Sequence, residues 1–199
     1  MSCSLRPRTF SAVAAGVEVE SDREQRFDAF VNGYRDRAVR IAWRLLGGDG
    51  AAAEDVAQEA FVRAYRGLAR FRDDAKLSTW FYRILVNEVR RHQRWRVHRE
   101  WRTGDREPDA VPDPVTCGDA PRPDPALRRR IGDAIAALPH GQREAFVLVH
   151  LEGFTLSEAA AATGRAVGTM KSHLHRGLTS LRARLADLAP SGTSAEERR

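Results

Sequence analysis

The fold is decided by residues 138–185, which read LPHGQREAFVLVHLEGFTLSEAAAATGRAVGTMKSHLHRGLTSLRARL. Thr155 and Glu158 have the spacing of a capping box, in which the hydroxyl accepts the amide of the third helical residue and the carboxylate reaches back. This start predicts a short helix that ends at Gly164, and Gly168-Thr169 is expected to open the next helix. Two helices joined by a tight turn that contains glycine form a helix-turn-helix.

The second of these helices has one apolar and one polar face. Its apolar residues recur at steps of three and four, and they are Met170, Leu174, Leu178, Leu181 and Leu185. Its polar and basic residues are Lys171, Ser172, His175, Arg176 and Thr179. A basic outer face on the second helix suits insertion into a DNA major groove, although an ordinary helical hairpin with a solvated face shows the same pattern.

Composition bounds the class of protein. The 199 residues carry a net charge of +6, which favours a nucleic-acid partner over an acidic substrate. A charged fraction of 30% and a mean hydropathy of −0.49 predict a soluble, cytoplasmic protein, and no apolar run is long enough to insert into a membrane. The only two cysteines, Cys3 and Cys117, are too few for a disulfide framework and are expected to be incidental thiols.

The sequence divides into segments by composition. Residues 107–126 hold six of the nine prolines and five acidic residues against one arginine, so they cannot pack a core and predict an extended linker. No repeat and no alternating β-branched run is present, which predicts an all-α fold of two small helical domains joined by a flexible acidic Pro-rich linker. The expected segments are a flexible tail (1–22), a helical domain (23–103), the linker (104–126), the helix-turn-helix domain (127–188) and a second flexible tail (189–199).

The helix expected over residues 53–68 is acidic at its start. Its first turns carry Glu54, Asp55, Gln58 and Glu59. Acidic side chains suit the positive end of the helix dipole, so a solvated helix start explains them. A docking patch for a basic partner surface explains them equally well.

The helix expected from Ser78 to beyond Trp95 is basic and aromatic. Residues 76–106 carry nine basic and three acidic residues, together with Trp80, Trp95 and Trp101. Arginine neutralises phosphates, and exposed aromatic rings stack on unpaired bases. The segment therefore predicts contact with single-stranded or melted DNA, unless the tryptophans anchor the core or the linker.

Two parts of the chain resemble one family. The stretches DVAQEAF (55–61) and FRDDAKLSTWFYRI (71–84), followed by Asn87, resemble the promoter −10 domain of extracytoplasmic-function (ECF) RNA polymerase sigma factors. The stretches LPHGQRE (138–144) and VGTMKSHLHR (167–176) resemble the −35 domain of the same family. The resemblance covers about residues 25–100 and 128–186, in the family's order and on either side of the acidic linker.

The resemblance implies a transcription initiation factor of bacterial stress responses, with no catalytic activity, cofactor or metal. Its implied partners are core RNA polymerase (the β′ clamp and the β flap), promoter DNA and an anti-sigma factor. Carried over by position, the core-docking residues are Asp55, Gln58 and Glu59. The implied −35 residues are Thr169, Lys171, Ser172, His175 and Arg176. The implied −10 residues, some of them around a captured base, are Arg72, Asp74, Lys76, Trp80, Tyr82, Arg83, Asn87, Arg90 and Arg91.

Five positions depart from the family's pattern. Asp73 stands in place of a usual glycine in the loop that captures the base, and Arg165-Ala166 replaces a usual Val-Pro in the turn. His173 replaces a usual arginine, which removes one expected phosphate contact. Gly177 stands where alanine is common, at a cost of about 1 kcal/mol inside a helix.

Two rival classes explain less of the sequence. A stand-alone helix-turn-helix regulator accounts for residues 138–185 but not for the acidic helix, the basic aromatic helix and the linker together. A metal-dependent enzyme is disfavoured because His173 and His175 point about 200° apart around a helix. His92 and His98 likewise have no cysteine or carboxylate cluster at ligand spacing.

Overall fold

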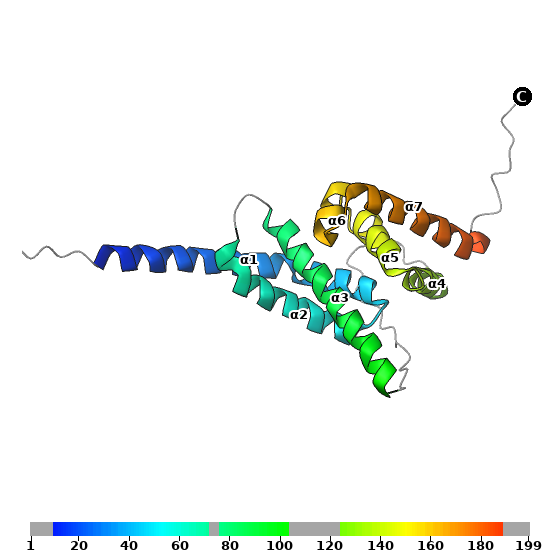
Figure 1. Ribbon diagram of the computed structural model, residues 1–199, viewed down its shortest axis with the longest axis horizontal. Helices are drawn as coiled ribbons and strands as arrows, with labels where there is room; N and C mark the ends of the chain where they lie inside the picture. Colours follow the sequence, from blue (N-terminus) through cyan, green and yellow to red (C-terminus); the bar gives the residue numbers. More distant parts are fainter. Residues whose placement is uncertain (1–9, 72–75, 104–123, 189–199) are drawn as a thin grey trace, which may run out of the picture. The chain divides into compact units, whose positions relative to one another are not determined.

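The computed structural model describes residues 10–71, 76–103 and 124–188, and in these ranges every element is a helix (Figure 1). The elements are α1 (Phe10–Leu46), α2 (Gly50–Gly67), the 3-10 turn η1 (Leu68–Arg70), α3 (Leu77–Thr103), α4 (Pro125–Ala136), α5 (His140–Phe146), the π-helical turn η2 (Val147–Leu151), α6 (Leu156–Thr163), α7 (Val167–Arg184) and η3 (Ala186–Leu188). The all-α prediction is confirmed for these residues. None of their helices is long and apolar enough to cross a membrane.

Helix α1 begins earlier than the sequence suggested. A flexible tail was expected over residues 1–22, yet the helix starts at Phe10. Its first turns contain three alanines, the best helix formers, and a single internal glycine costs only about 1 kcal/mol. Residue contacts divide the chain into two units, Met1–Asp36 and Arg37–Arg199. In the first unit, Phe30 stacks on Phe27 and on Tyr34, with ring centroids 6.2 and 4.3 Å apart.

Within the second unit, the end of α1 leads through a glycine turn into α2. Gly47 and Gly48 have φ angles of +81° and +105°, which only glycine adopts without strain. Asp49 then caps α2 by accepting the amide of Ala52 at 2.9 Å. Helices α2 and α3 lie side by side (Figure 1). The rings of Phe61 and Phe81 stack between them at 4.4 Å.

The predicted helix-turn-helix is present as α6 and α7. Thr155 Oγ1 accepts the Glu158 amide at 3.2 Å, and Glu158 Oε2 accepts the Thr155 amide at 2.9 Å, so the capping box is confirmed. Gly164 ends α6 in the left-handed region with φ +64°. Met170 and Leu181 of α7 are buried, as their spacing predicted.

Helices α5 and α7 approach each other closely through two glycines. A Cβ at Gly177 would lie 3.3 Å from the Gln142 carbonyl oxygen, and one at Gly141 would lie 2.8 Å from the His173 ring. Gly177, which departs from the family's alanine, therefore has a packing role that offsets its low helix propensity. The His173 ring lies against Gly141. The longer arginine side chain that the family usually has at position 173 would not pack there in the same way.

The capping box predicts a measurable stability change. We expect Thr155→Ala to lower the free energy of unfolding by about 0.5–2 kcal/mol, because the Glu158 amide loses its acceptor at the start of α6. The matched control is Thr179→Ala, which removes an exposed hydroxyl bonded only to the His175 carbonyl within α7. Urea unfolding followed by circular dichroism measures both; equal losses would contradict the prediction.

The same box sets a pH dependence. Hydrogen bonds from the Thr155 amide and hydroxyl lower the pKa of Glu158 below its ordinary value. A carboxyl group whose pKa is lower in the folded than in the unfolded protein stabilises the fold at pH values above its unfolded pKa of about 4.3. This stabilisation is lost as the pH falls through the lowered pKa of the folded state. Thr155→Ala should therefore raise the Glu158 pKa, as followed by NMR titration of the carboxyl carbon.

Candidate nucleic-acid and protein interfaces

One face of α7 is exposed and polar. The side chains of Thr169, Lys171, Ser172, His175 and Arg176 all lie exposed, as the −35 prediction requires. They lie between the third and the tenth residue of the helix, and no side chain caps its start at Ala166. A helix start with unpaired amides attracts anions, which suits a phosphate backbone near these residues.

Helix α3 presents only part of the residues predicted for the −10 element. Lys76, Arg83, Asn87 and Arg91 are exposed, whereas Trp80 and Arg90 are half-buried and Tyr82 is buried. The Tyr82 ring packs edge-on against Phe154 at 4.9 Å, so it lies in the core of this structure and away from the surface that Arg83 and Asn87 occupy. Arg72, Asp74 and the neighbouring Asp73 lie outside the described residues.

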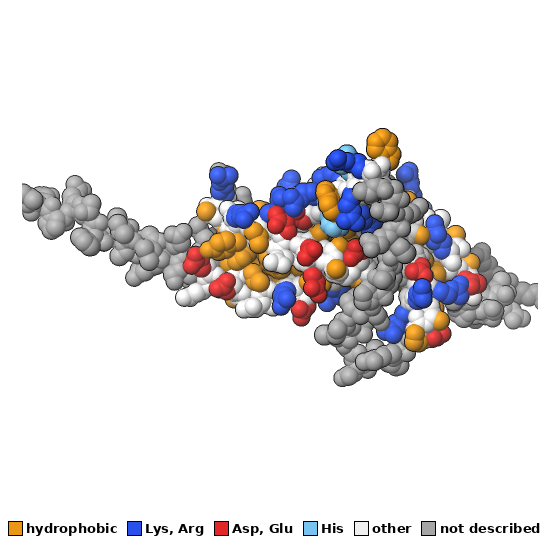
Figure 2. All heavy atoms as spheres, turned by 90° about the horizontal axis from the view of Figure 1, so that it is seen from below, with side chains coloured by type: hydrophobic (Ala, Val, Ile, Leu, Met, Phe, Trp, Pro, Cys, Tyr) orange, Lys and Arg blue, Asp and Glu red, His pale blue; other side chains and the backbone are white. Residues whose placement is uncertain are grey.

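The three tryptophans of this segment take different positions. Trp80 packs against the ring of Phe71 at 5.1 Å and lies close to Gly67, in a supporting position. Trp95 and Trp101 are 55% and 88% exposed, and the Arg99 guanidinium lies 5.1 Å from the Trp95 ring. These two rings therefore do not anchor the core. Figure 2 shows Lys and Arg side chains gathered along one edge of the molecule, with acidic side chains beside them.

The acidic start of α2 is also exposed, but one residue of it is internally paired. Asp55 and Gln58 are exposed, whereas Glu59 is half-buried and pairs with Arg63 at 3.0 Å and with Arg91 at 3.5 Å. Arg91 also pairs at 2.7 Å with Glu88, whose side chain is buried. Predicted docking and DNA-binding residues are thus linked by one ion-pair network.

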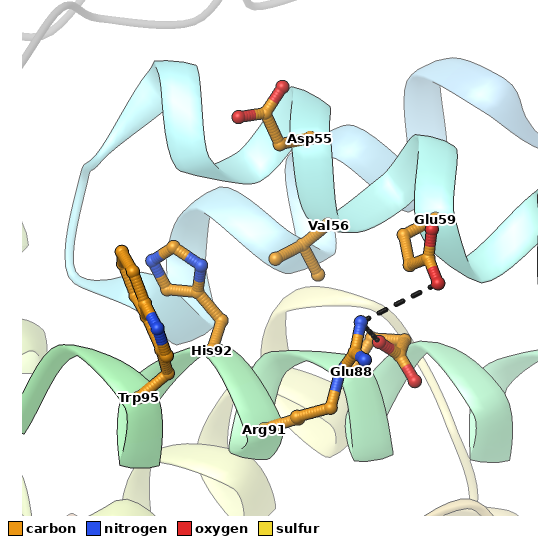
Figure 3. A pocket seen from close by; sticks show the side chains of 7 residues that line it. All are labelled: Asp55, Val56, Glu59, Glu88, Arg91, His92 and Trp95. Carbon is orange, nitrogen blue, oxygen red and sulfur yellow. Dashed lines mark ion pairs between the residues drawn. The ribbon is translucent and has the colours of Figure 1, made fainter. Parts of the chain in front are cut away.

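This network lines a shallow groove of about 520 Å³ between α2 and α3 (Figure 3). Asp55, Val56 and Glu59 come from α2, and the facing side chains from α3 are Glu88, Arg91, His92 and Trp95. In the close-up, Arg91 points toward both carboxylates while Asp55 points away from α3. Of the predicted docking residues, Asp55 therefore has the carboxylate most open to a partner.

Two further carboxylates, which lie outside the residues predicted to contact DNA or polymerase, bind arginines from distant helices. The Arg90 guanidinium donates to both oxygens of Glu144 at 2.7 and 2.8 Å and to the Thr163 carbonyl at 2.9 Å. Arg165, which stands in the turn where the family usually has valine, also donates to Glu144 at 3.1 Å. This unusual residue therefore has a structural role. The other partner of Glu144, Arg90, lies 54 residues away, so local spacing in the sequence could not identify this pair.

Glu152 is bound by three arginines of α1. Arg37 and Arg40 each approach it at 3.3 Å, and Arg44 does so at 2.5 Å. Burial lowers the pKa of Arg44, and the Glu152 charge opposes that shift. The three arginines are three and four residues apart, which places them on one helix face, and this spacing was the available signal in the sequence.

The described residues contain no group of three or more His, Cys, Asp or Glu side chains that could hold a metal ion. His173 and His175 separate as their spacing implies: His175 is exposed, whereas His173 is half-buried against Gly141. The groups gathered at these surfaces are charged and aromatic side chains, which bind phosphates, bases and protein surfaces.

Comparison with known proteins matches both halves of the chain. Residues 30–99 match the Sigma-70 region 2 model, and residues 128–181 match the model of Sigma-70, region 4. The ECF RNA polymerase sigma factor SigW of Bacillus subtilis is 31% identical over 188 residues, which cover 86% of this chain and 95% of SigW. The RNA polymerase sigma-E factor of Streptomyces coelicolor is 33% identical over 175 residues, which cover 86% of this chain and 94% of that protein.

A solved structure agrees with these matches. The sigma factor RpoE of Bartonella quintana, determined in complex with the anti-sigma factor NepR, superposes with a TM-score of 0.70 at 25% identity, over 81% of this chain and 98% of that one. A −10-binding region followed by a −35-binding region defines a promoter-recognition subunit of the sigma-70 kind. The chain belongs to the ECF RNA polymerase sigma factors, which direct the polymerase to promoters. This membership disfavours a stand-alone helix-turn-helix regulator.

The buried carboxylate beneath the groove gives a second stability prediction. We expect Glu88→Gln to lower the free energy of unfolding by about 1–2 kcal/mol, because Arg63 and Arg91 lose a buried counter-ion while staying partly screened by water. Glu54→Gln, an exposed acidic position on α2, should change it by less than about 0.5 kcal/mol. Guanidinium unfolding of both variants measures this, and equal effects would refute the structural role of Glu88.

Proposed function

We propose that three sets of residues divide the work of promoter recognition. The α7 residues Thr169, Lys171, Ser172, His175 and Arg176 read the −35 duplex. The α3 residues Lys76, Arg83, Asn87, Arg90 and Arg91, with Trp80 behind them and the loop residues Arg72 and Asp74 beside them, hold the separated −10 strand. The α2 residues Asp55, Gln58 and Glu59 dock on the β′ clamp of the polymerase.

The main support for this proposal is that basic and acidic side chains lie on different exposed faces. The α7 face is basic while its opposite face packs in the core, and the exposed start of α2 is acidic. Basic surfaces suit phosphates, and an acidic surface suits a basic protein partner. Tyr82 is left out of the DNA surface because its ring is buried against Phe154.

The remaining roles follow from family membership. We propose that the helix-turn-helix half, residues 127–188, also contacts the β flap, and that residues 23–103 form the −10 half. We further propose that the protein acts in the cytoplasm without catalysis or cofactor and is held inactive by an anti-sigma factor. Support for that partner comes from relatives solved with one, such as Bartonella quintana RpoE with NepR.

The docking surface is tested by charge reversal at Asp55. We expect Asp55→Arg to weaken binding to core bacterial RNA polymerase by about tenfold or more, because an exposed carboxylate facing a basic surface becomes a like charge. Size-exclusion comigration followed by fluorescence titration measures the loss. Glu59 is the poorer site for this test, because its reversal would also break the pairs with Arg63 and Arg91.

The matched control for docking is Asp28→Arg, which makes the same charge change at an exposed position of α1. Comigration of wild type and control, without Asp55→Arg, supports the assignment. Comigration of all three discards the docking face but keeps the function. Failure of the wild-type protein to bind polymerase at all would overturn the proposed function.

The −35 surface is tested at Arg176. In polymerase holoenzyme, on a promoter obtained by selection from random DNA, Arg176→Ala should weaken binding by about 1–3 kcal/mol and relax sequence preference at one −35 position. Arg182→Ala removes the same charge from an exposed position near the end of α7 and should leave the preference unchanged. Equal losses in both variants would indicate a general charge effect and refute base reading by Arg176.

A further inference from the structure

A cavity of about 560 Å³ lies within the unit Arg37–Arg199 and is lined by the end of α1, the turn that follows it, α4 and the last residue of η2. Its volume is in the range of pockets that hold small organic ligands. Among the described residues, none that we assign individually to promoter DNA or to the β′ clamp lines this cavity. The functions proposed above therefore leave it without a role.

The walls of the cavity are largely apolar. Ile131 of α4 and Leu151 of η2 are each 37% exposed, and both line the cavity together with Ile135 and the ring of Trp43. Large apolar side chains that lie exposed on a concave surface mark binding sites, because a ligand that covers them removes hydrocarbon from water. The walls therefore suit the apolar body of a ligand.

The indole of Trp43 adds a polar group to one wall. Its Nε1 atom is shielded from solvent and has no hydrogen-bond acceptor among the residues that the structure describes. A shielded donor without an acceptor costs free energy. A ligand with an oxygen atom against the edge of this ring would offer the acceptor that these residues do not supply.

The rim of the cavity is basic. Arg44, Arg128 and Arg129 line it, against a single carboxylate, that of Asp133. Arg44 also contacts Glu152 at 2.5 Å, whereas Arg129 lies exposed at the surface of α4. Guanidinium groups bind anions through charge-assisted hydrogen bonds, so this excess of arginine favours a ligand with a negative group.

Gly132 leaves space on the α4 side of the cavity. It stands inside α4 in ordinary helical backbone, although glycine is a poor helix former. A Cβ at this position would meet no heavy atom within 4 Å, so close packing does not require the glycine either. Because Gly132 lines the cavity, a larger side chain there would fill part of it.

We propose that this cavity binds a small amphipathic anion, such as a fatty or aromatic carboxylate. The apolar body of the ligand lies against Ile131, Leu151 and the Trp43 ring, and its anionic group faces the arginines of the rim. Binding involves neither the promoter nor the polymerase surfaces, so this site goes beyond the proposed function and is tested without DNA or polymerase.

The site is tested by fluorescence titration of the full chain with anilinonaphthalene sulfonate, a probe with an aromatic body and one sulfonate, whose emission rises in an apolar site. We expect saturable binding to the wild-type protein and about tenfold weaker binding to Gly132→Leu, which fills the cavity. The matched control is Gly33→Leu, at an exposed glycine of α1 where a Cβ also meets nothing within 4 Å. This control should bind the probe as the wild type does.

The preference for an anion is tested in two ways. Ile131→Glu places a carboxylate at the cavity and should bind the probe about fivefold more weakly than Val97→Glu, which makes the same change at an exposed position of α3. Decanoate should displace the probe from the wild-type protein. Decylammonium, which has the same chain length and the opposite charge, should not displace it.

Three results would overturn the proposal. Equal binding of the probe to Gly132→Leu and Gly33→Leu would show that it binds elsewhere on the protein. Equal competition by decanoate and decylammonium would show an apolar surface without preference for anions. Absence of saturable binding to the wild type would remove the site altogether.

Far-UV circular dichroism establishes that each variant keeps its helices. If Gly132→Leu does not fold, the comparison of Ile131→Glu with Val97→Glu decides where the probe binds. The polymerase comigration described above fails separately if the sigma function itself is wrong.

Discussion

The structure depends on the pairing of buried carboxylates with arginines. Glu88, Glu144 and Glu152 are each buried, and each meets at least two guanidinium groups. Removing a carboxylate from water costs several kcal/mol. Only cations that lie close to it, with good hydrogen-bond geometry, offset this cost. The arginines that do so come from α1, α2, α3 and the turn before α7, so these three side chains tie together most of the described helices.

This constraint sorts the arginines of a strongly basic chain into two groups. Arg63, Arg90 and Arg165 hold buried carboxylates and are fixed by them. Arg83 and Arg176 lie exposed on the faces assigned to DNA. Net charge alone therefore overstates the surface available to phosphates. Arg90 and Arg91 belong to both groups, since each combines a predicted DNA role with an internal partner.

Local features of the fold could be predicted from the sequence, because they arise from neighbours in the chain. The capping box at Thr155, the stop at Gly164 and the buried stripe of α7 depend on spacings of three and four residues. The exposed polar face of α7 followed from the same periodicity. The early start of α1 was missed, because residues 1–22 show no sustained helical period of apolar side chains.

Long-range pairing could not be predicted in this way. The Arg37–Glu152 contact joins residues 115 positions apart, and the Arg90–Glu144 contact joins residues 54 apart. A glutamate within an apolar stretch indicates that a cation will pair with it in the fold. The chain has many arginines, however, and the sequence does not identify which of them forms the pair. The burial of Tyr82 is of the same kind, because its partner Phe154 lies in the other half of the chain.

The two kinds of contact differ in how they respond to a partner. The apolar core of the helix-turn-helix half has Leu148 and Met170 fully buried, so opening it would expose hydrocarbon that neither DNA nor a protein surface replaces. The arginine–carboxylate contacts differ, because a phosphate satisfies a guanidinium as well as a carboxylate does. A surface built from such pairs can exchange one anion for another at little net cost.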